Sequence, residues 1–310
     1  MITVIGSINI DLVAKASRLP QTGETVAGKT FSIDAGGKGA NQALAARRAG
    51  TDVQFIGAVG QDNFSSSALV LLREENVDLS SVKSVNEPTG TALISVNDEG
   101  ENAIIVIAGA NNTITKEDAA TAISAMHQSD VLMLQLEIPA NVVEFSLNIA
   151  RQKGVRSILN IAPFLPDASR LSGLADIIIA NETEFQLLAA DIALPADNLE
   201  TALADLHQRS GQSFVVTLGA DGVIAVHNGH IYSSNGLTIK PVDTVGAGDT
   251  FCGYFAASIA ANVPFPEALQ RAAIAGSLAC TKTGAQEAIP NAKEVETLMI
   301  EHLDTLQAQN

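Results

Sequence analysis

Residues 131–161 read VLMLQLEIPANVVEFSLNIARQKGVRSILNI, which is an apolar run, an amphipathic stretch and a second apolar run. The runs Val131–Leu136 and Arg156–Ile161 are short and rich in Val, Ile and Leu, as strands buried on both faces are. Between them apolar residues recur at helical spacing, and the helix is expected to end before Gly154. This order of strand, helix and strand is typical of a parallel sheet covered by helices.

The same alternation runs through the rest of the chain. One helix is expected from about Gly39 to just before Gly50, and another after Asp197, which is placed to cap it. We therefore predict an α/β fold in which a doubly wound, mostly parallel sheet carries helices on both faces. The other candidate strands of this sheet are Ile2–Gly6, Val53–Val59, Asp176–Ala180 and Phe214–Leu218.

Two segments depart from this alternation. Residues 10–34 and 89–107 contain short alternating apolar patterns and glycine-containing turns, which are typical of β strands. We expect them to form a small β sheet inserted into the core. Residues 1–310 are then a single domain.

Composition narrows the classes of function. Acidic residues outnumber basic ones by 34 to 18, and the formal charge of -16 repels nucleic acid and anionic lipid, so neither is an expected partner. The two cysteines, Cys252 and Cys280, fit neither a disulfide framework nor a metal site, which favours a reducing cytoplasm. The sequence has no basic leader and no apolar run of about 18 residues, so secretion and membrane spanning are not expected.

The segment Asp243–Asp249 (DTVGAGD) follows a β-like stretch and precedes an apolar helix. Gly246 and Gly248 let backbone N–H groups approach a phosphate, and the start of the helix adds the positive end of its dipole. Asp249 can there accept the proton of an attacking hydroxyl, which fits phosphoryl transfer. The alternative is a glycine-rich helix start that Asp249 caps without a ligand. A dinucleotide site is excluded, because Phe251 stands where that motif requires its third glycine.

Polar residues near the N-terminus suggest a site for a hydroxylated ligand. Gly36–Asn41 (GGKGAN) opens a helix but is not a P-loop, because no Ser or Thr follows Lys38. Its glycines let backbone approach a small ligand whose hydroxyls Lys38 and Asn41 can bind, although a plain loop with a solvated lysine also explains the pattern. Asn9 and Asp11 lie two residues apart on an extended chain and can bind vicinal hydroxyls; a turn after a strand is the alternative.

Further polar residues follow candidate strands, where ligands of open α/β sheets collect. Glu137 follows one strand, and Asn181 and Glu184 follow another. Glu184 can hold Mg²⁺ through water, or it can close a capping box with Asn181. Thr217–Gly222 ends a third strand, and its two glycines suit a nucleotide or a simple β turn.

In this order, from Val4 to about Pro290, these segments resemble the ribokinase branch of the ribokinase-like carbohydrate kinases. The DTVGAGD string is highly specific for that superfamily. The resemblance implies a doubly wound α/β core with a β lid, to which the segments 10–34 and 89–107 correspond in position. It also implies homodimers that pair through their lids.

The resemblance further implies a role for each matching residue. Asp249 would be the base that activates a sugar hydroxyl, and Glu184 would lie near Mg²⁺ bound with ATP. The anion hole would be formed by the amides of Gly246, Ala247 and Gly248; the sugar would be held by Asn9, Asp11, Gly37, Lys38, Asn41 and Glu137; and the ATP site would be lined by Asn181, Thr217, Gly219, Gly222 and Gly248.

Members of this family are also activated by a monovalent cation, usually K⁺, beside the anion hole. Ala288 stands where a serine hydroxyl commonly completes the cation's shell, and water can replace that hydroxyl. Ala273 stands where some members place a larger residue beside the adenine. The positions that match the cation shell are Asp243 and the carbonyls of Val245, Ala279, Lys282 and Gly284.

We therefore expect ATP-dependent phosphorylation of D-ribose at its 5-hydroxyl, giving D-ribose 5-phosphate and ADP, with Mg²⁺ and K⁺. The nearest alternative is the same chemistry on 2-deoxyribose, fructose or a nucleoside. Asn9 and Asp11 favour vicinal hydroxyls, and the scarcity of aromatic residues in the lid disfavours a stacked nucleobase. A sugar-binding protein without turnover is a further alternative, disfavoured because it has no need of Asp249 as a base.

Overall fold

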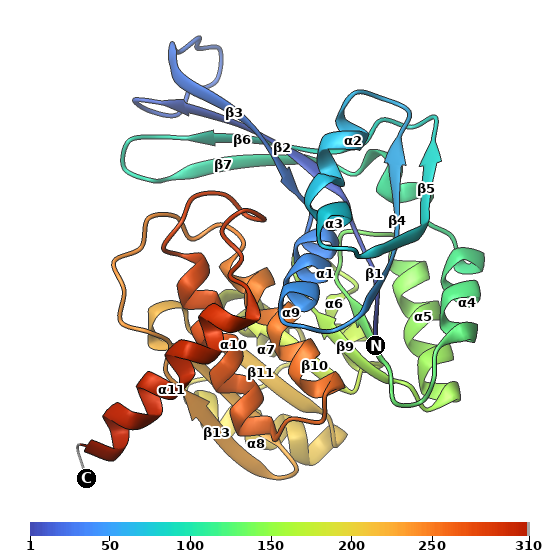
Figure 1. Cartoon of the computed structure of the whole chain (residues 1–310), viewed down its shortest axis with the longest axis vertical. Helices are drawn as coiled ribbons and strands as arrows, with labels where there is room; N and C mark the ends of the chain where they lie inside the picture. Colours follow the sequence, from blue (N-terminus) through green and yellow to red (C-terminus); the bar gives the residue numbers. More distant parts are fainter. Residues whose placement is uncertain (309–310) are drawn as a thin grey trace.

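The computed structural model describes the backbone of residues 1–308 and the side chains of residues 1–300, and it contains a large and a small β sheet (Figure 1). The large sheet has nine strands in the order β13-β12-β11-β10-β9-β8-β1-β4-β5. Neighbouring strands run parallel from β11 to β5, while β12 and β13 pair antiparallel. The strands are β1 (Ile2–Ile5), β4 (Val53–Gly60), β5 (Asp78–Val85), β8 (Val131–Leu134), β9 (Arg156–Asn160), β10 (Ile177–Asn181), β11 (Ser213–Thr217), β12 (Val223–His227) and β13 (His230–Ser234).

Every strand expected from an apolar run is present in the large sheet. All residues of β1 and β8 are buried, because helices cover both faces of the sheet at its centre. The sequence pattern did not reveal β5, which pairs with β4 at the edge of the sheet. Its sequence, DLSSVKSV, is largely polar and its residues are exposed or half-buried, so no apolar run marks it.

Helices pack on both faces of the large sheet, and each face has its own apolar core. Val4 and Ile5 are neighbours on β1, yet they point into different cores and are both fully buried. The predicted doubly wound α/β fold is therefore confirmed. One face carries α1 (Lys38–Arg48), α3 (Val70–Glu74), α9 (Ala247–Ala260), α10 (Phe265–Ala279) and α11 (Ala292–Ala308); the other carries α4 (Lys116–Ala125), α5 (Ala140–Lys153), α6 (Ala168–Ser172), α7 (Glu182–Asp191) and α8 (Leu199–Ser210).

The ends of these helices follow local chemistry. Gly154 ends α5 in the left-handed region with a φ of 72°, as expected. The expected cap of α8 was wrong by one residue, because Asn198 and not Asp197 precedes the helix directly. Asn198 has an extended backbone, and its Oδ1 accepts the N–H of Thr201 at 2.9 Å. No helix in the described part of the chain has the length and apolar character needed to cross a membrane.

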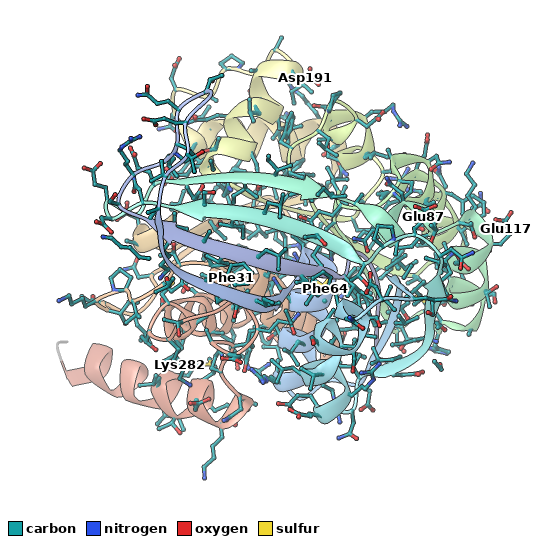
Figure 2. All side chains as sticks on the ribbon, turned by 90° about the horizontal axis from the view of Figure 1, so that it is seen from above. Phe31, Phe64, Glu87, Glu117, Asp191 and Lys282 are labelled. Carbon is teal, nitrogen blue, oxygen red and sulfur yellow. The ribbon has the colours of Figure 1, made fainter. Side chains whose placement is uncertain are left out.

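The small sheet has the strand order β3-β2-β6-β7 and lies across one end of the molecule (Figures 1 and 2). Asn9, the first residue of β2, pairs with Gly36 on one side and Gly90 on the other. Much of this sheet is exposed: Phe31 is 62% exposed and Ile105 is 64% exposed. Its strands are β2 (Asn9–Ala16), β3 (Gly28–Gly36), β6 (Gly90–Val96) and β7 (Asn102–Ile107), and the remaining short helices are α2 (Phe64–Ala68), η1 (Gly109–Thr113) and η2 (Gly219–Asp221).

Candidate active site

The predicted site residues gather at the edge of the large sheet where its parallel strands end. Glu137 follows β8, Asn181 ends β10 and Thr217 ends β11, and Asn160, which the sequence analysis missed, ends β9. A cavity of about 120 Å³ joins the last three of these to Asp249, which lies in the first turn of α9. The parallel order of the strands therefore places these polar side chains beside the start of one helix.

Two glycines at the start of α9 serve different purposes. Gly246 has a φ of 77°, and a Cβ there would lie 2.8 Å from the carbonyl oxygen of Ala285, so the fold itself requires a glycine. A Cβ at Gly248 would meet no such neighbour within 4 Å, although this residue lines the cavity. The space beside Gly248 is therefore available to a ligand.

The amides at this helix start are partly free. The N–H of Ala247 donates to the carbonyl of Thr244 across 3.3 Å. Among the residues that the structure describes, the N–H groups of Gly246 and Gly248 have no hydrogen-bond acceptor. These two amides and the helix dipole can bind an anion directly, whereas the Ala247 amide must first leave Thr244.

The Asp249 carboxylate is 8% exposed, and each of its oxygens accepts an amide hydrogen bond. Asn41 Nδ2 donates to Oδ2 at 2.9 Å, and Gln42 Nε2 donates to Oδ1 at 2.8 Å. Each oxygen keeps a lone pair for a further donor. The sequence analysis found Asn41 but missed Gln42, whose signal is a long polar side chain among the small apolar residues of α1.

Lys38 and Glu184 line the same cavity as Asp249. The charge of Asp249 is the largest cause that raises the pKa of Lys38; burial opposes it, and Glu137 and Glu184 add to it. Burial raises the pKa of Glu184, against the effect of the N–H of Asn181. A charged ammonium group thus lies among several carboxylates, where it can also attract phosphate.

The capping box expected as one role of Asn181 and Glu184 is confirmed. Asn181 Oδ1 accepts the N–H of Glu184 at 2.8 Å, and Glu184 Oε2 accepts the N–H of Asn181 at 2.9 Å. Both residues still line the cavity, so capping fixes them beside any ligand held there. The structural role and a binding role are compatible.

A second cavity, of about 410 Å³, adjoins the first and shares Thr217 and Gly248 with it. Gly219 borders open space, whereas a Cβ on Gly222 would lie 2.2 Å from the carbonyl oxygen of Ser234, so packing of the chain explains this second glycine. The size and mixed lining suit the base and ribose of a nucleotide. The apolar side chains in its wall are Ala220, Leu237, Ile239, Pro241, Ala247, Phe251 and Ala273.

Asn9 and Asp11 begin β2, the strand that leads into the small sheet. Asn9 is buried, and its Oδ1 accepts Asn111 Nδ2 at 2.8 Å. Asn111 also bonds the N–H and the carbonyl of Ile8, at 2.9 and 3.1 Å. The sequence analysis missed Asn111, which holds the amide of Asn9 in one orientation and leaves its Nδ2 for a ligand.

Asp11 is held in an unfavourable environment for a charge. Burial is the largest cause that raises its pKa to about 7, followed by the charges of Glu137, Asp34 and Asp249, while Lys38 lowers it. A Cβ on Gly36 would lie 2.4 Å from Asp11 Oδ2, so the carboxyl group rests on the backbone of β3.

The glycines of the GGKGAN segment approach the protein's own backbone. A Cβ on Gly37 would lie 2.7 Å from the amide nitrogen of Asn9, and one on Gly39 would lie 2.5 Å from that of Ser7. These close approaches give the two glycines a structural role, and the approach of this backbone to a ligand stays a prediction. They allow the start of α1 to sit against the turn between β1 and β2.

Glu137 fastens the same turn to β8. Its Oε2 accepts Ser7 Oγ at 2.6 Å and the N–H of Lys38 at 3.0 Å. One carboxylate oxygen therefore fixes two segments of the predicted sugar site, and the other remains for a ligand hydroxyl.

The segment expected to hold a monovalent cation forms a tight turn beside α9. Asp243 Oδ1 accepts the N–H of Val245 at 3.0 Å, and Oδ2 accepts the N–H of Gly284 at 3.1 Å. The carbonyl of Ala279 accepts the N–H of Lys282 across 3.4 Å. Ala288 is buried and contributes only a methyl group.

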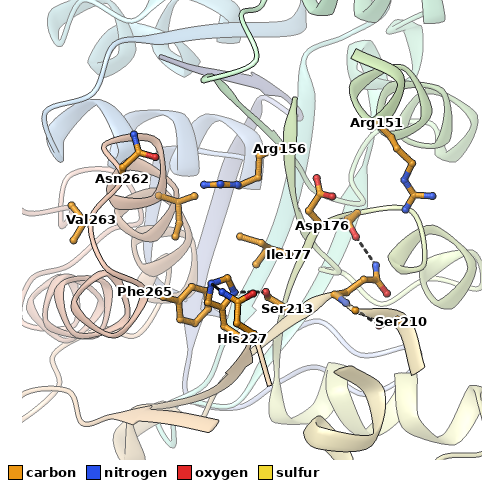
Figure 3. Close-up of a pocket in the computed structure, with 15 residues that line it drawn as sticks. Arg151, Arg156, Asp176, Ile177, Ser210, Ser213, His227, Asn262, Val263 and Phe265 are labelled. Carbon is orange, nitrogen blue, oxygen red and sulfur yellow. Dashed lines mark hydrogen bonds between the residues drawn. The ribbon is translucent and has the colours of Figure 1, made fainter. Parts of the chain in front are cut away.

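A further cavity, of about 430 Å³, lies at the opposite edge of the sheet, where β9, β10 and β11 begin (Figure 3). Arg156, Asp176 and His227 border it, and His227 Nδ1 shares a hydrogen bond of 2.7 Å with Ser213 Oγ. None of the predicted site residues lines this cavity. The candidate active site is therefore at the other edge.

A doubly wound α/β fold, a buried carboxylate beside free helix-start amides and an adjoining nucleotide-sized cavity define a kinase that acts on small hydroxylated molecules. Residues 1–292 match the model of the pfkB family of carbohydrate kinases. The chain belongs to this family.

Several individual ribokinases are similar to the chain over nearly its whole length. The chain is 35% identical over 294 residues to the ribokinase of Haemophilus influenzae, and the aligned region covers 94% of this chain and 96% of that relative. The solved structure of ribokinase from Thermotoga maritima superposes with a TM-score of 0.86 at 31% identity, covering 96% of this chain and 99% of the other. Arabidopsis thaliana ribokinase, solved with ribose and ATP, has a TM-score of 0.85 at 32% identity, covering 96% and 97%.

Proposed function

We propose that this chain phosphorylates D-ribose at its 5-hydroxyl with ATP, giving D-ribose 5-phosphate and ADP. The observation that carries the proposal is the position of Asp249, buried between two amide donors and bordering the small cavity beside Gly248. The relatives described above are ribokinases, and one of them was solved with ribose and ATP.

In this proposal Asp249 takes the proton from the attacking hydroxyl as the phosphoryl group transfers. The N–H groups of Gly246 and Gly248, joined by that of Ala247, stabilise the negative charge of the transferring group. Lys38 lines the same cavity as Asp249 and adds a positive charge there, beside the transferring phosphoryl group. Positioning and charge neutralisation supply most of the rate increase in such reactions.

The sugar would lie between α1 and the start of β2. Asn9 Nδ2 and Asp11 would bind its vicinal hydroxyls, with the backbone of Gly37 and the side chains of Lys38, Asn41 and Glu137 around them. Asp11 favours ribose over 2-deoxyribose, because a carboxylate placed for two hydroxyls loses a donor when one is absent.

The nucleotide would occupy the cavity of about 410 Å³, with its phosphates directed through the shared residues Thr217 and Gly248 toward Asp249. Gly219 and Gly222 would shape its wall, and Asn181 and Glu184 would lie on the phosphate side. Mg²⁺ would be bound by the phosphates and reached by Glu184 through water, where it neutralises phosphate charge.

We also propose a K⁺ site at the turn formed by Asp243. A carboxylate and backbone carbonyls suit a weakly hydrated cation, and Asp243 already holds two N–H groups of this turn in place. The carbonyls would come from Val245, Ala279, Lys282 and Gly284, while Ala288 leaves one position to water. A bound cation would stabilise the turn that leads into the anion hole.

The small sheet is the proposed lid and dimer interface. Phe31, Ile33 and the whole apolar run Ile104–Ile107 are exposed on it, which is more apolar surface than a lone sheet usually presents to water. The molar mass of the chain in solution, measured by light scattering, decides whether it is a homodimer. The two free thiols, Cys252 and Cys280, are compatible with the proposed cytoplasmic location.

The test is ADP release with a panel of D-ribose, 2-deoxyribose, fructose and nucleosides. We expect D-ribose to give the highest kcat/KM, and Asp249→Asn to abolish turnover while its affinity for D-ribose stays near that of the parent. Sugar binding without turnover on any member of the panel would contradict a kinase. A near-normal rate for Asp249→Asn would remove the assignment of the base.

A further inference from the structure

Gln42 uses its whole side-chain amide inside the protein. Its Nε2 donates both hydrogens, to Asp249 Oδ1 at 2.8 Å and to Asn160 Oδ1 at 3.0 Å, and its Oε1 accepts Gln135 Nε2 at 2.6 Å. Gln42 is 0% exposed, so no water competes for these bonds. A buried amide with three partners is held in one position.

The direction of the Gln42 amide is fixed by its neighbours. If the amide of Gln42 were turned over, its oxygen would face two acceptor oxygens and its nitrogen would face the nitrogen of Gln135. Asn160 is fixed in the same way, because its Nδ2 donates to the carbonyl of Ile179 at 3.1 Å. Gln42 therefore donates to Asp249 from α1, and it is held there by Asn160 at the end of β9 and by Gln135 just after β8.

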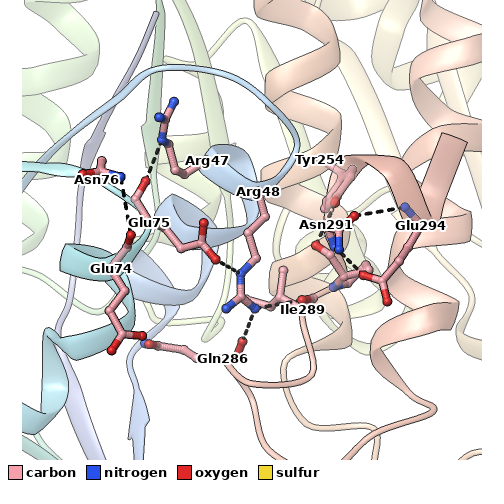
Figure 4. A network of polar contacts seen from close by, with 11 residues as sticks. Arg47, Arg48, Glu74, Glu75, Asn76, Tyr254, Gln286, Ile289, Asn291 and Glu294 are labelled. Atoms are coloured by element: carbon pink, nitrogen blue, oxygen red, sulfur yellow. Dashed lines mark hydrogen bonds and ion pairs between the residues drawn. The ribbon is translucent and has the colours of Figure 1, made fainter.

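A second chain of amides reaches the other oxygen of Asp249. Gln286 Nε2 donates to Asn41 Oδ1 at 3.1 Å, and Asn41 Nδ2 donates to Asp249 Oδ2 at 2.9 Å. Arg48 holds the backbone carbonyl of Gln286 at 2.8 Å and pairs with Glu75 at 2.9 Å (Figure 4). Each oxygen of Asp249 thus accepts a hydrogen bond from an amide that has further partners inside the protein.

A positive charge on the same cavity gives these hydrogen bonds a purpose. Lys38 and Asp249 both line the cavity of about 120 Å³, yet no ion pair within 4.0 Å joins them in the described part of the chain. A carboxylate free to rotate would close onto the ammonium group and lose the lone pair that must face the substrate. The amide of Gln42 opposes that rotation from the side of Oδ1.

We propose that Gln42 is a positioning residue, which aims the Asp249 carboxylate at the substrate hydroxyl and keeps it from pairing with Lys38. This inference rests on the proposed role of Asp249 as the base. Gln42 is fully buried and lines neither of the two cavities of the site, so its removal should lower kcat and leave substrate affinity almost unchanged.

The experiment compares Gln42→Leu and Gln42→Glu with the parent enzyme and with Gln212→Glu. Leu places an apolar side chain of similar size in the buried position, and Glu keeps an acceptor for Gln135 while replacing both amide N–H donors with a carboxyl group. Gln212→Glu is the matched control, because Gln212 Nε2 also donates to two carbonyls, those of Ser172 and Ala175, but at the opposite edge of the sheet. Circular dichroism and thermal unfolding check that each variant folds.

We expect kcat to fall by about 100-fold in both Gln42 variants, the loss that a small misplacement of a reacting group causes. KM for D-ribose stays near that of the parent, and Gln212→Glu keeps the parent kcat. The acid limb of the kcat profile of Gln42→Leu moves to higher pH, because the carboxylate has lost one of its two donors. A merely structural loss would not move this limb.

Folded Gln42 variants with the parent kcat and pH profile, alongside an inactive Asp249→Asn, would overturn the inference and leave the proposed function intact. Should Asp249→Asn be active, the base assignment fails and the positioning role fails with it, and NMR then tests only the hydrogen bond between Gln42 and Asp249. In glutamine-¹⁵N-labelled protein the Gln42 amide, assigned by its loss in Gln42→Leu, should exchange slowly and shift in Asp249→Asn. Exchange as fast as that of an exposed glutamine would contradict the arrangement.

Discussion

Replacing Asp11 with Asn should stabilise the ligand-free protein relative to the parent more at pH 8 than at pH 5. The quantity compared is the difference in the free energy of unfolding between variant and parent. The pKa of Asp11 rises from 3.8 to about 7 on folding, chiefly because of burial. Between these values the folded state holds a proton that the unfolded state has lost, so the stability of the parent falls as pH rises and the loss is complete above pH 7. Asn does not titrate and escapes this loss.

The size of this stability difference follows from the part of the pKa shift of Asp11 that lies above pH 5. About two pH units separate pH 5 from the pKa of about 7, and each unit corresponds to about 1.4 kcal/mol, so the advantage of Asp11→Asn should grow by about 2–3 kcal/mol between pH 5 and pH 8. Any change in packing is common to both pH values and cancels. Urea unfolding of parent and variant at both pH values measures the difference. An advantage of equal size at pH 5 and pH 8 would refute the reasoning.

The same exchange should cost sugar affinity. If Asp11 accepts hydrogen bonds from two hydroxyls, Asp11→Asn weakens D-ribose binding by about 1.5–3 kcal/mol, the worth of hydrogen bonds to a charged group. Calorimetric titration at pH 8 measures this loss. A stabilised variant with unchanged affinity would show that the carboxyl group is not used for the sugar.

Two glycine substitutions test the site geometry further. Gly36→Ala would place a Cβ 2.4 Å from Asp11 Oδ2 and should raise KM for D-ribose in steady-state assays. Gly28→Ala, at the other end of β3, is the control: its Cβ meets only Lys15 O at 3.6 Å, and KM should stay unchanged. Gly248→Ala meets no neighbour within 4 Å, so thermal unfolding should be almost unaffected while turnover falls by about 100-fold or more, because the methyl group occupies the place of the phosphate. A variant that unfolds early, or one that keeps its rate, would contradict the assignment of this space to a ligand.

The sequence predicted those parts of the fold that depend on local patterns. Apolar runs marked the central strands, since residues of β8 that are covered on both faces must be apolar throughout. The fold is confirmed, and the sequence selected Asn41 and Asp249 because each lies at a glycine-rich helix start, which has a local signature. The polar edge strand β5 had no such signature and was missed.

The side chains that complete the site could not be predicted, because their partners are distant in sequence. Gln42 bonds Asp249 across 207 positions, and Asn111 bonds Asn9 across 102. Neither residue belongs to a motif with recognisable spacing, so only the folded chain reveals its role. The glycines at 37 and 39 show the same limit: their pattern indicates close approach, but not that the approaching group is the chain itself.

The two amide chains on Asp249 also constrain when the enzyme first becomes competent during synthesis. Asn41 can make its hydrogen bonds only after Asp249, 208 positions later, and Gln286, 245 positions later, have been synthesised. A ribosome-bound chain that has released its first 240 residues can form most of the large sheet. Asp249 is still missing, however, so the sugar-binding segments lack the residue proposed as the base. The active site can therefore be completed only late, when the last fifth of the chain packs against α1.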